Sequence, residues 1–223
     1  MDKQADFEHY PFYFKNVGKD KILSFAYQLI KEKNYLKVFL QQRDSITLEV
    51  LSEQKSIDSI LDFSSSSNSL AMVDSSSINV FNLAQEFKQS LFQGRISNCD
   101  YFANGSISPD GKLAALSGSS SEDCSRVSLW KGIVRIWDVD NGMKIFGDDR
   151  FKPGSIVKFI SDSKLAIANQ LNVEIIDIPS FTIAATLNYS GIGVRNLYDA
   201  PIDKVILQVG PESNKFMVIS DNG

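Results

Sequence analysis

A pattern of short apolar runs and polar turns recurs about every 40 residues and constrains this chain more than any other feature of its sequence. Each copy holds an apolar run, a polar turn, a second apolar run, another turn, and a third run. The copies begin near residues 22, 60, 105, 156 and 194. The repetition predicts that the chain folds as a series of similar units.

The copies align on the last apolar residue before the first turn, which is Phe25, Phe63, Ile107, Phe159 or Leu197. The third runs then begin at Ile46, Ile78, Val134, Val173 and Phe216. Units of about 40 residues with three or four strands are typical of the blades of a β-propeller. We therefore expect an all-β fold with about five four-stranded antiparallel blades.

A helical alternative exists for Lys21–Leu40. Ile22, Phe25, Ala26, Leu29 and Ile30 recur at the spacing of an amphipathic helix. The segment nevertheless has the layout of the other copies, with "ILSF" at the place of "ILDF" from Ile60. Two strands are therefore the favoured interpretation of this segment.

The third copy has specific turn chemistry. In "SPDGK", from Ser108, a proline with preset φ precedes a glycine that tolerates positive φ. In "DVDNG", from Asp138, Asn141-Gly142 stands between two apolar runs, which is a strong hairpin signal.

These residues carry a resemblance. "SPDGKLAALSG", then Trp137-Asp138, then "DNG" resembles the repeat of the WD-repeat β-propellers. The other four copies match in layout only, and in one of them Asp177 stands at the position of the Asp in the Trp-Asp pair. The resemblance implies a propeller that binds proteins or peptides without catalysis, and it makes Trp137 a core residue.

The chain departs from that family in one respect. Repeats of the family often carry a histidine that joins a hydrogen-bonded network with Ser, Asp and Trp, but the single histidine here is His9, far from such a position. We therefore expect apolar packing between sheets to hold the blades together.

The last copy ends after its third strand. One interpretation is a single domain, residues 1–223, in which the strand-like residues 10–16 close the ring as the missing fourth strand. The alternative is a portion of a larger propeller of about seven blades, which would make the chain a structural set of blades within a larger protein or complex.

Composition narrows the function classes. The net charge is −4, which gives no basic footprint for nucleic acid. No apolar stretch approaches the length of a membrane span. The two cysteines, Cys99 and Cys124, form no disulfide framework and are typical of a reducing compartment, although a single bridge between them stays open. We expect an intracellular protein, cytoplasmic or nuclear.

Catalytic motifs are sparse. One histidine and two distant cysteines give no usual metal site, and no phosphate-binding glycine motif occurs, so no cofactor or metal is expected. A propeller-based enzyme is the weaker alternative. It would need polar groups around a central channel, where the first runs offer Asp62, Lys158 and Arg195.

The best candidate for a binding site is a pair of long loops, residues 93–105 and 119–132. The resemblance to the WD-repeat propellers implies that they flank one blade on the same face. Aromatic and arginine side chains dominate interface energies. We expect burial of Trp130 and Tyr101 by a protein partner, with arginines orienting its acidic groups. The alternatives are that both aromatic residues fold back as a local plug, or that "RVSLW" is an extra strand. The candidate residues are Arg95, Tyr101, Phe102, Arg126, Trp130 and Lys131.

Overall fold

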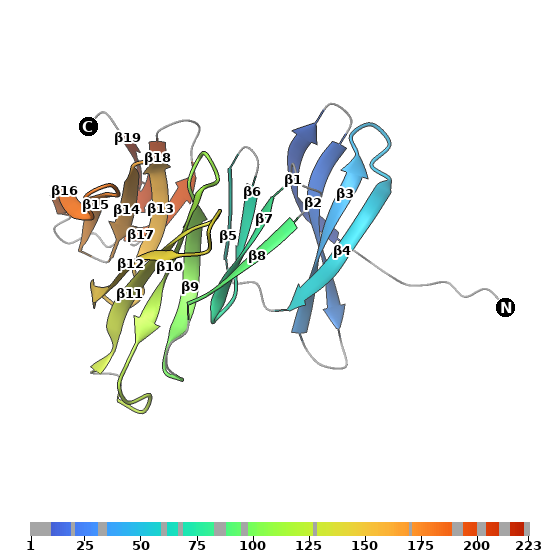
Figure 1. Ribbon diagram of the computed structural model, residues 1–223. Coiled ribbons are helices and arrows are strands. Elements are labelled where there is room, and N and C mark those ends of the chain that lie inside the picture. The colour runs from blue at the N-terminus through green and yellow to red at the C-terminus, as the bar shows by residue number, and fades with distance from the viewer. Residues whose placement is uncertain are drawn as a thin grey trace. The chain divides into compact units, whose positions relative to one another are not determined.

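The chain divides into two compact units, residues 1–60 and residues 61–223. Its described residues form 19 strands in five antiparallel sheets (Figure 1). The prediction of a single domain stays a prediction. The computed structural model describes residues 10–18, 21–30, 35–58, 62–66, 69–82, 88–94, 98–126, 129–169, 171–188, 194–199, 204–209 and 215–220.

The first unit is one meander of four strands in the order β1-β2-β3-β4, and these are β1 Tyr10–Gly18, β2 Lys21–Ile30, β3 Tyr35–Asp44 and β4 Val50–Asp58. The prediction of strands over Lys21–Leu40 is confirmed, since β2 and β3 pair along their whole length.

Two predictions for this unit are wrong. Residues 10–16 lie in β1, which pairs with β2, so they form the first strand of this sheet and do not complete the last one. Ile46 begins no third strand, because it lies 84 % exposed in the turn between β3 and β4. The unit therefore starts near residue 10 rather than residue 22, and adjacent strands pair as hairpins because that closes the shortest loops.

The second unit holds three sheets of four strands and one of three (Figure 1). The first two contain β5 Asp62–Ser65, β6 Ser69–Val73, β7 Ser77–Asn82 and β8 Lys88–Gln93, then β9 Tyr101–Ile107, β10 Leu113–Ser120, β11 Lys131–Asp138 and β12 Lys144–Phe151. The others contain β13 Ile156–Ser161, β14 Lys164–Ala168, β15 Asn172–Asp177 and β16 Thr182–Asn188, then β17 Val194–Asp199, β18 Lys204–Val209 and β19 Lys215–Ser220.

The repeat positions agree with this arrangement from the second copy onward. The predicted third runs at Ile78, Val134, Val173 and Phe216 lie in β7, β11, β15 and β19, the third strand of each sheet. Both predicted turns also form. Gly111 and Gly142 adopt φ of +79° and +72°, the left-handed region that glycine tolerates at low cost.

The core of the second unit lies between neighbouring sheets. Successive side chains of a strand point to opposite faces. Ile133 and Trp137 of β11 accordingly pack toward β5–β8, while Val134 and Ile136 of the same strand pack toward β13–β16. A sheet buried on both faces has near-continuous apolar strands, which explains sequences such as "LAAL" and "IVRIW". Trp137 is buried and packs against Phe92 with ring centroids 6.1 Å apart, so its predicted core role is confirmed.

Hydrogen bonds join the first strands of successive sheets. Ile107 N of β9 donates to Ser64 Oγ of β5 over 3.2 Å. Val157 N and Phe159 N of β13 donate to Asn104 Oδ1 and Ser106 Oγ of β9, over 2.8 and 3.0 Å. Packing between sheets is largely apolar, as expected. In addition, these polar side chains accept hydrogen bonds from amides on the open edges of the first strands, which the sequence analysis did not predict.

Candidate functional site

The two long loops of the third sheet lie side by side at one end of it. β9 and β10 are antiparallel neighbours in which Tyr101 pairs with Ser119, so the chain that enters β9 runs beside the chain that leaves β10. The loops are shorter than predicted because β9 begins at Tyr101 and β11 begins at Lys131. We call their described residues, 98–101 and 119–131 without 127 and 128, the loop pair.

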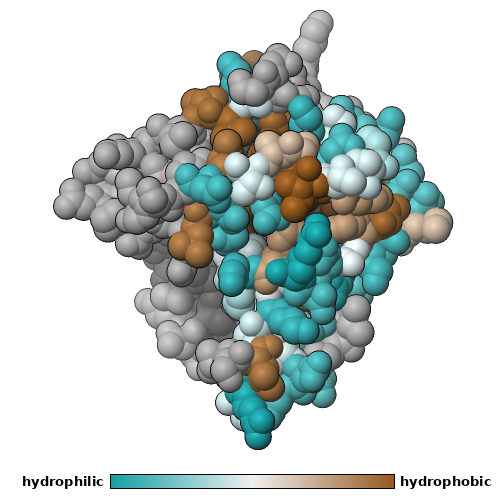
Figure 2. All heavy atoms as spheres, turned by 90° about the vertical axis from the view of Figure 1, so that its left-hand side faces the viewer, coloured by the Kyte–Doolittle hydropathy of each residue, from teal (hydrophilic) through white to brown (hydrophobic). Residues whose placement is uncertain are grey.

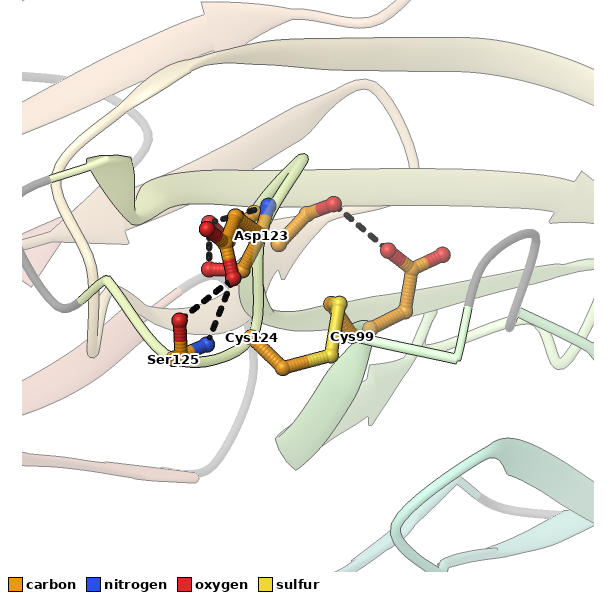
Figure 3. The surroundings of a disulfide bond; sticks show 7 residues. Cys99, Asp123, Cys124 and Ser125 are labelled. Carbon is orange, nitrogen blue, oxygen red and sulfur yellow. Dashed lines mark hydrogen bonds between the residues drawn. A yellow bond between two sulfur atoms is a disulfide. The ribbon is translucent and has the colours of Figure 1, made fainter.

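A disulfide bond between Cys99 and Cys124 joins the two halves of the loop pair (Figure 3). The bridge that the sequence left open therefore forms. Beside it, Ser120 Oγ donates a 2.5 Å hydrogen bond to Asp100 Oδ1. The base of the first loop is also fixed, because Phe102 N donates to Ser75 O of the preceding sheet over 3.1 Å.

The turn of residues 121–126 is held by its own hydrogen bonds. The hydroxyl and amide of Ser125 both donate to Asp123 Oδ1, over 2.7 and 3.0 Å (Figure 3). These two bonds lower the pKa of Asp123 from its ordinary value, with the hydroxyl bond the larger cause. Asp123 also lies 3.4 Å from Arg126 Nε, so an ionised carboxylate and a guanidinium pair on the exposed turn.

A pocket of about 280 Å³ opens at the base of the second loop. Lys131 Nζ and Asp149 Oδ2 lie 4.0 Å apart in its wall, and Leu129 supplies an apolar side. Ligand pockets for drug-sized molecules usually start at about 300 Å³, so this volume suits one or two side chains of a peptide. The lining residues are Ser120, Ser121, Glu122, Leu129, Lys131 and Asp149.

The predicted contact residues differ in their exposure to solvent. Tyr101, Arg126 and Lys131 are exposed on the loop pair. Phe102 is fully buried and packs in the core between the second and third sheets, because alternation along β9 turns it inward where Tyr101 turns outward. Phe102 is thus a core residue and not a contact residue.

Trp130 is half-buried, and its indole Nε1 is buried without a hydrogen-bond partner among the described residues. This position fits the alternative in which the residue folds back onto the sheet, whereas Tyr101, 46 % exposed, does not fold back. Arg95 lies outside the described residues, as do residues 127 and 128 of the "RVSLW" segment, and its described residues, Arg126, Leu129 and Trp130, lie in no strand.

Sequence reasoning missed Leu129, Glu122, Asp149 and the role of the cysteines. One signal was available for the disulfide, because each of the two predicted loops contains one cysteine. No comparable signal marked Asp149, which comes from β12 and reaches the pocket only through the pairing of β12 with β11.

The residues considered for other chemistry can be placed in part. Lys158 is 4 % exposed and its Nζ donates to Gly105 O over 3.2 Å, so it serves the contact between β13 and β9. Within the described ranges, no group of three or more His, Cys, Asp or Glu side chains is arranged to hold a metal ion. The described part of the chain also contains no helix of the length and apolarity needed to cross a membrane.

Comparison with known proteins supports the fold. No protein-family model matches the sequence, and no curated protein matches it. A chain in a crystal structure of the mitotic checkpoint complex is similar, with a TM-score of 0.59 and 14 % identity over 99 % of this chain and 81 % of that one. The acylaminoacyl peptidase of Pyrococcus horikoshii is similar too, with a TM-score of 0.61 and 12 % identity over 97 % of this chain and 39 % of the peptidase.

Both neighbours contain propellers, and the four-stranded antiparallel sheets found here are the blades of that architecture. The protein therefore has the β-propeller fold, as predicted. Identities this low show the fold alone, and membership of the WD-repeat family stays a prediction. One neighbour is part of a checkpoint complex and the other is a peptidase, so the likeness does not by itself separate binding from catalysis.

Proposed function

We propose that this protein is a non-catalytic scaffold that binds a protein or peptide partner through the loop pair. The observation that carries the proposal is the Cys99–Cys124 bridge, which joins two long loops into one surface beside a pocket of about 280 Å³. Fixing the loops in advance lowers the conformational cost of binding. The propeller in a chain of the mitotic checkpoint complex is consistent with such a role.

The charges of the loop pair favour a basic segment of the partner. Arg126 is paired with Asp123, and Lys131 lies near Asp149, so the two predicted cations that the structure describes already face carboxylates of this chain. Glu122 lines the pocket with no ion pair among the described residues. We therefore propose that a Lys or Arg side chain enters beside Leu129 and pairs with Glu122, instead of the acidic partner expected from Arg95 and Arg126.

An exposed apolar residue elsewhere on the surface can serve as a control position for a cross-linking experiment. Figure 2 shows hydrophobic side chains in separate groups among hydrophilic ones, on the side of the molecule that carries β16. Ile183 of β16 is 44 % exposed and Leu129 of the loop pair is 43 % exposed. A photo-reactive side chain at either position therefore meets solvent to the same extent.

The experiment places a photo-reactive phenylalanine analogue at Leu129 or at Ile183 and irradiates the protein in an extract of its source cells. We expect one recurrent adduct from position 129 that is absent from position 183. The adduct should weaken about tenfold when Glu122→Lys is added, because the reversed charge repels a basic segment. Equal adducts from both positions, or indifference to Glu122→Lys, would contradict the proposed site.

A further inference from the structure

The disulfide lies where a reductant can reach it. Cys124 is exposed and Cys99 is half-buried. Figure 3 shows the bridge running between the turn of residues 121–126 and the segment that enters β9. Both cysteines belong to the loop pair, so any change in the bond acts directly on the proposed binding surface.

Few other contacts hold the turn to the neighbouring segment. The bonds of Ser121, Asp123 and Ser125 that involve described residues stay within residues 121–126, and the one bond that leaves this range joins Arg126 O to Leu129 N of the same loop. Ser120 Oγ to Asp100 Oδ1 is the side-chain hydrogen bond that links the base of the turn to the other loop. Among the described contacts, those that remain without the disulfide keep the internal shape of the turn and attach it to the other loop at its base.

The pocket depends on that attachment. Ser121 and Glu122 lie on the turn, whereas Lys131 and Asp149 lie on β11 and β12. A turn that moves as a unit carries one wall of the pocket away from the other. The pairing of β9 with β10 is backbone hydrogen bonding within the sheet and is independent of the disulfide.

We propose that the Cys99–Cys124 disulfide is a reversible redox switch that keeps the loop pair competent to bind its partner, and that a cellular thiol reductant turns binding off. The inference rests on the proposed function, because it assigns regulation to the same surface. It also reconciles the disulfide with the expectation of an intracellular protein, since disulfides in reducing compartments are usually transient or redox-sensing.

The chemistry balances with a thiol reductant such as glutathione or a protein dithiol. Its thiolate attacks the exposed Cys124 Sγ, forms a mixed disulfide and releases Cys99 as a thiolate, which takes up a proton. A second thiolate of the reductant then displaces Cys124. The protein gains two electrons and two protons as two thiols, and the reductant leaves as its disulfide.

The first arm of the test measures the bond and the turn without any partner. The full chain is equilibrated in glutathione buffers whose reduction potentials span that of the cytosol. Free thiols are then counted by alkylation and mass spectrometry, and amide hydrogen exchange is measured on the same samples. We expect a partly reduced population in that range and roughly tenfold faster exchange at residues 121–126 on reduction, with Leu116 and Ile136 unchanged. A disulfide that stays fully oxidised, or exchange at 121–126 that does not change, would overturn the switch.

The second arm repeats the cross-linking from position 129 with oxidised protein, reduced protein, and the Cys99→Ser/Cys124→Ser variant. We expect the adduct to fall at least about fivefold in both thiol-free and reduced proteins, since both lack the bridge. An adduct of equal strength in all three would overturn redox control and leave the proposed function standing. An adduct missing in all three, with a turn that still loosens on reduction, would instead refute the proposed function.

Discussion

At Gly118, β10 passes close to the backbone of β9. A Cβ atom at this position would lie 2.1 Å from Tyr101 O, and the pairing of the two strands shifts register between Ser117 and Gly118. Only a residue without a side chain fits this approach. At Gly147 on β12, by contrast, the nearest atom to a Cβ would be Arg135 Cδ at 3.4 Å, an ordinary contact.

The two glycines make a matched pair of substitutions. We expect Gly118→Ala to lower the free energy of unfolding by about 1–3 kcal/mol, because backbone must move. Gly147→Ala should change it by less than about 0.5 kcal/mol. Urea unfolding followed by tryptophan fluorescence measures the second unit, since the chain has two tryptophans, Trp130 and Trp137. Similar destabilisation by both variants would contradict the close approach.

Asp74 closes the turn between β6 and β7. Its carboxylate accepts four hydrogen bonds, from the amides and hydroxyls of Ser76 and Ser77, at 2.6–2.9 Å. Burial on its own raises the pKa of Asp74, but the bonds from Ser77 and Ser76 together outweigh burial and lower it. The folded state therefore prefers the ionised form of this group.

This preference predicts a pH dependence. The pKa of an unfolded aspartate is about 3.9, so the contribution of ionised Asp74 is complete above that pH and is lost as pH falls through the lower folded pKa. We expect Asp74→Asn to cost about 1–2 kcal/mol at pH 7, with a difference from wild type that shrinks as the pH falls below the unfolded pKa of about 3.9. Urea unfolding at several pH values tests this, with Asp140→Asn in an exposed turn as control. A difference that stays constant with pH would refute the argument.

The first strands of the sheets are the elements that meet between blades. Their outer-edge amides would otherwise be unpaired, and Asn104 and Ser106 of β9 accept hydrogen bonds from two amides of β13. A buried amide that loses its acceptor costs more than the net value of the bond. Small polar residues in "FANGSIS" therefore serve the contact with the next sheet, although they resemble loop residues in the sequence.

Alanine at either position tests this role. We expect Asn104→Ala and Ser106→Ala each to lower the free energy of unfolding by about 1–3 kcal/mol. The control is Thr186→Ala on the exposed strand β16, which should change it by less than about 0.5 kcal/mol. If all three variants unfold at the same urea concentration, other acceptors satisfy the amides of β13.

The elements also show where sequence reasoning succeeded. Turn residues and apolar runs placed β7, β11, β15 and β19 correctly, because each lies between polar turns in a sheet buried on both faces. The first sheet was misaligned by one strand. The copy that was taken to begin at residue 22 begins with β2, which is the second strand of this sheet, and β1 precedes it. The strands of this sheet are also 9–10 residues long.

At the scale of the whole molecule, the disulfide links positions 25 residues apart in the second unit. Closing such a loop in the unfolded chain removes entropy worth about 3 kcal/mol. We expect Cys99→Ser/Cys124→Ser to lower the free energy of unfolding, measured in urea, by about 3 kcal/mol under oxidising conditions. In dithiothreitol the variant and the wild type should unfold together. A difference that persists under reduction would mean that the serines disturb packing.

The sequence alone determined the class of fold, since its period, turn residues and apolar runs are local properties that the chain carries into any environment. It also indicated that the loops around the third sheet are unusually long. Only the tertiary structure decided that Phe102 is buried while Tyr101 is exposed, that Cys99 and Cys124 join, and that Asp149 completes the pocket. These outcomes depend on which strands pair and in which register, and pairing brings together residues whose separation in the sequence says nothing about their distance.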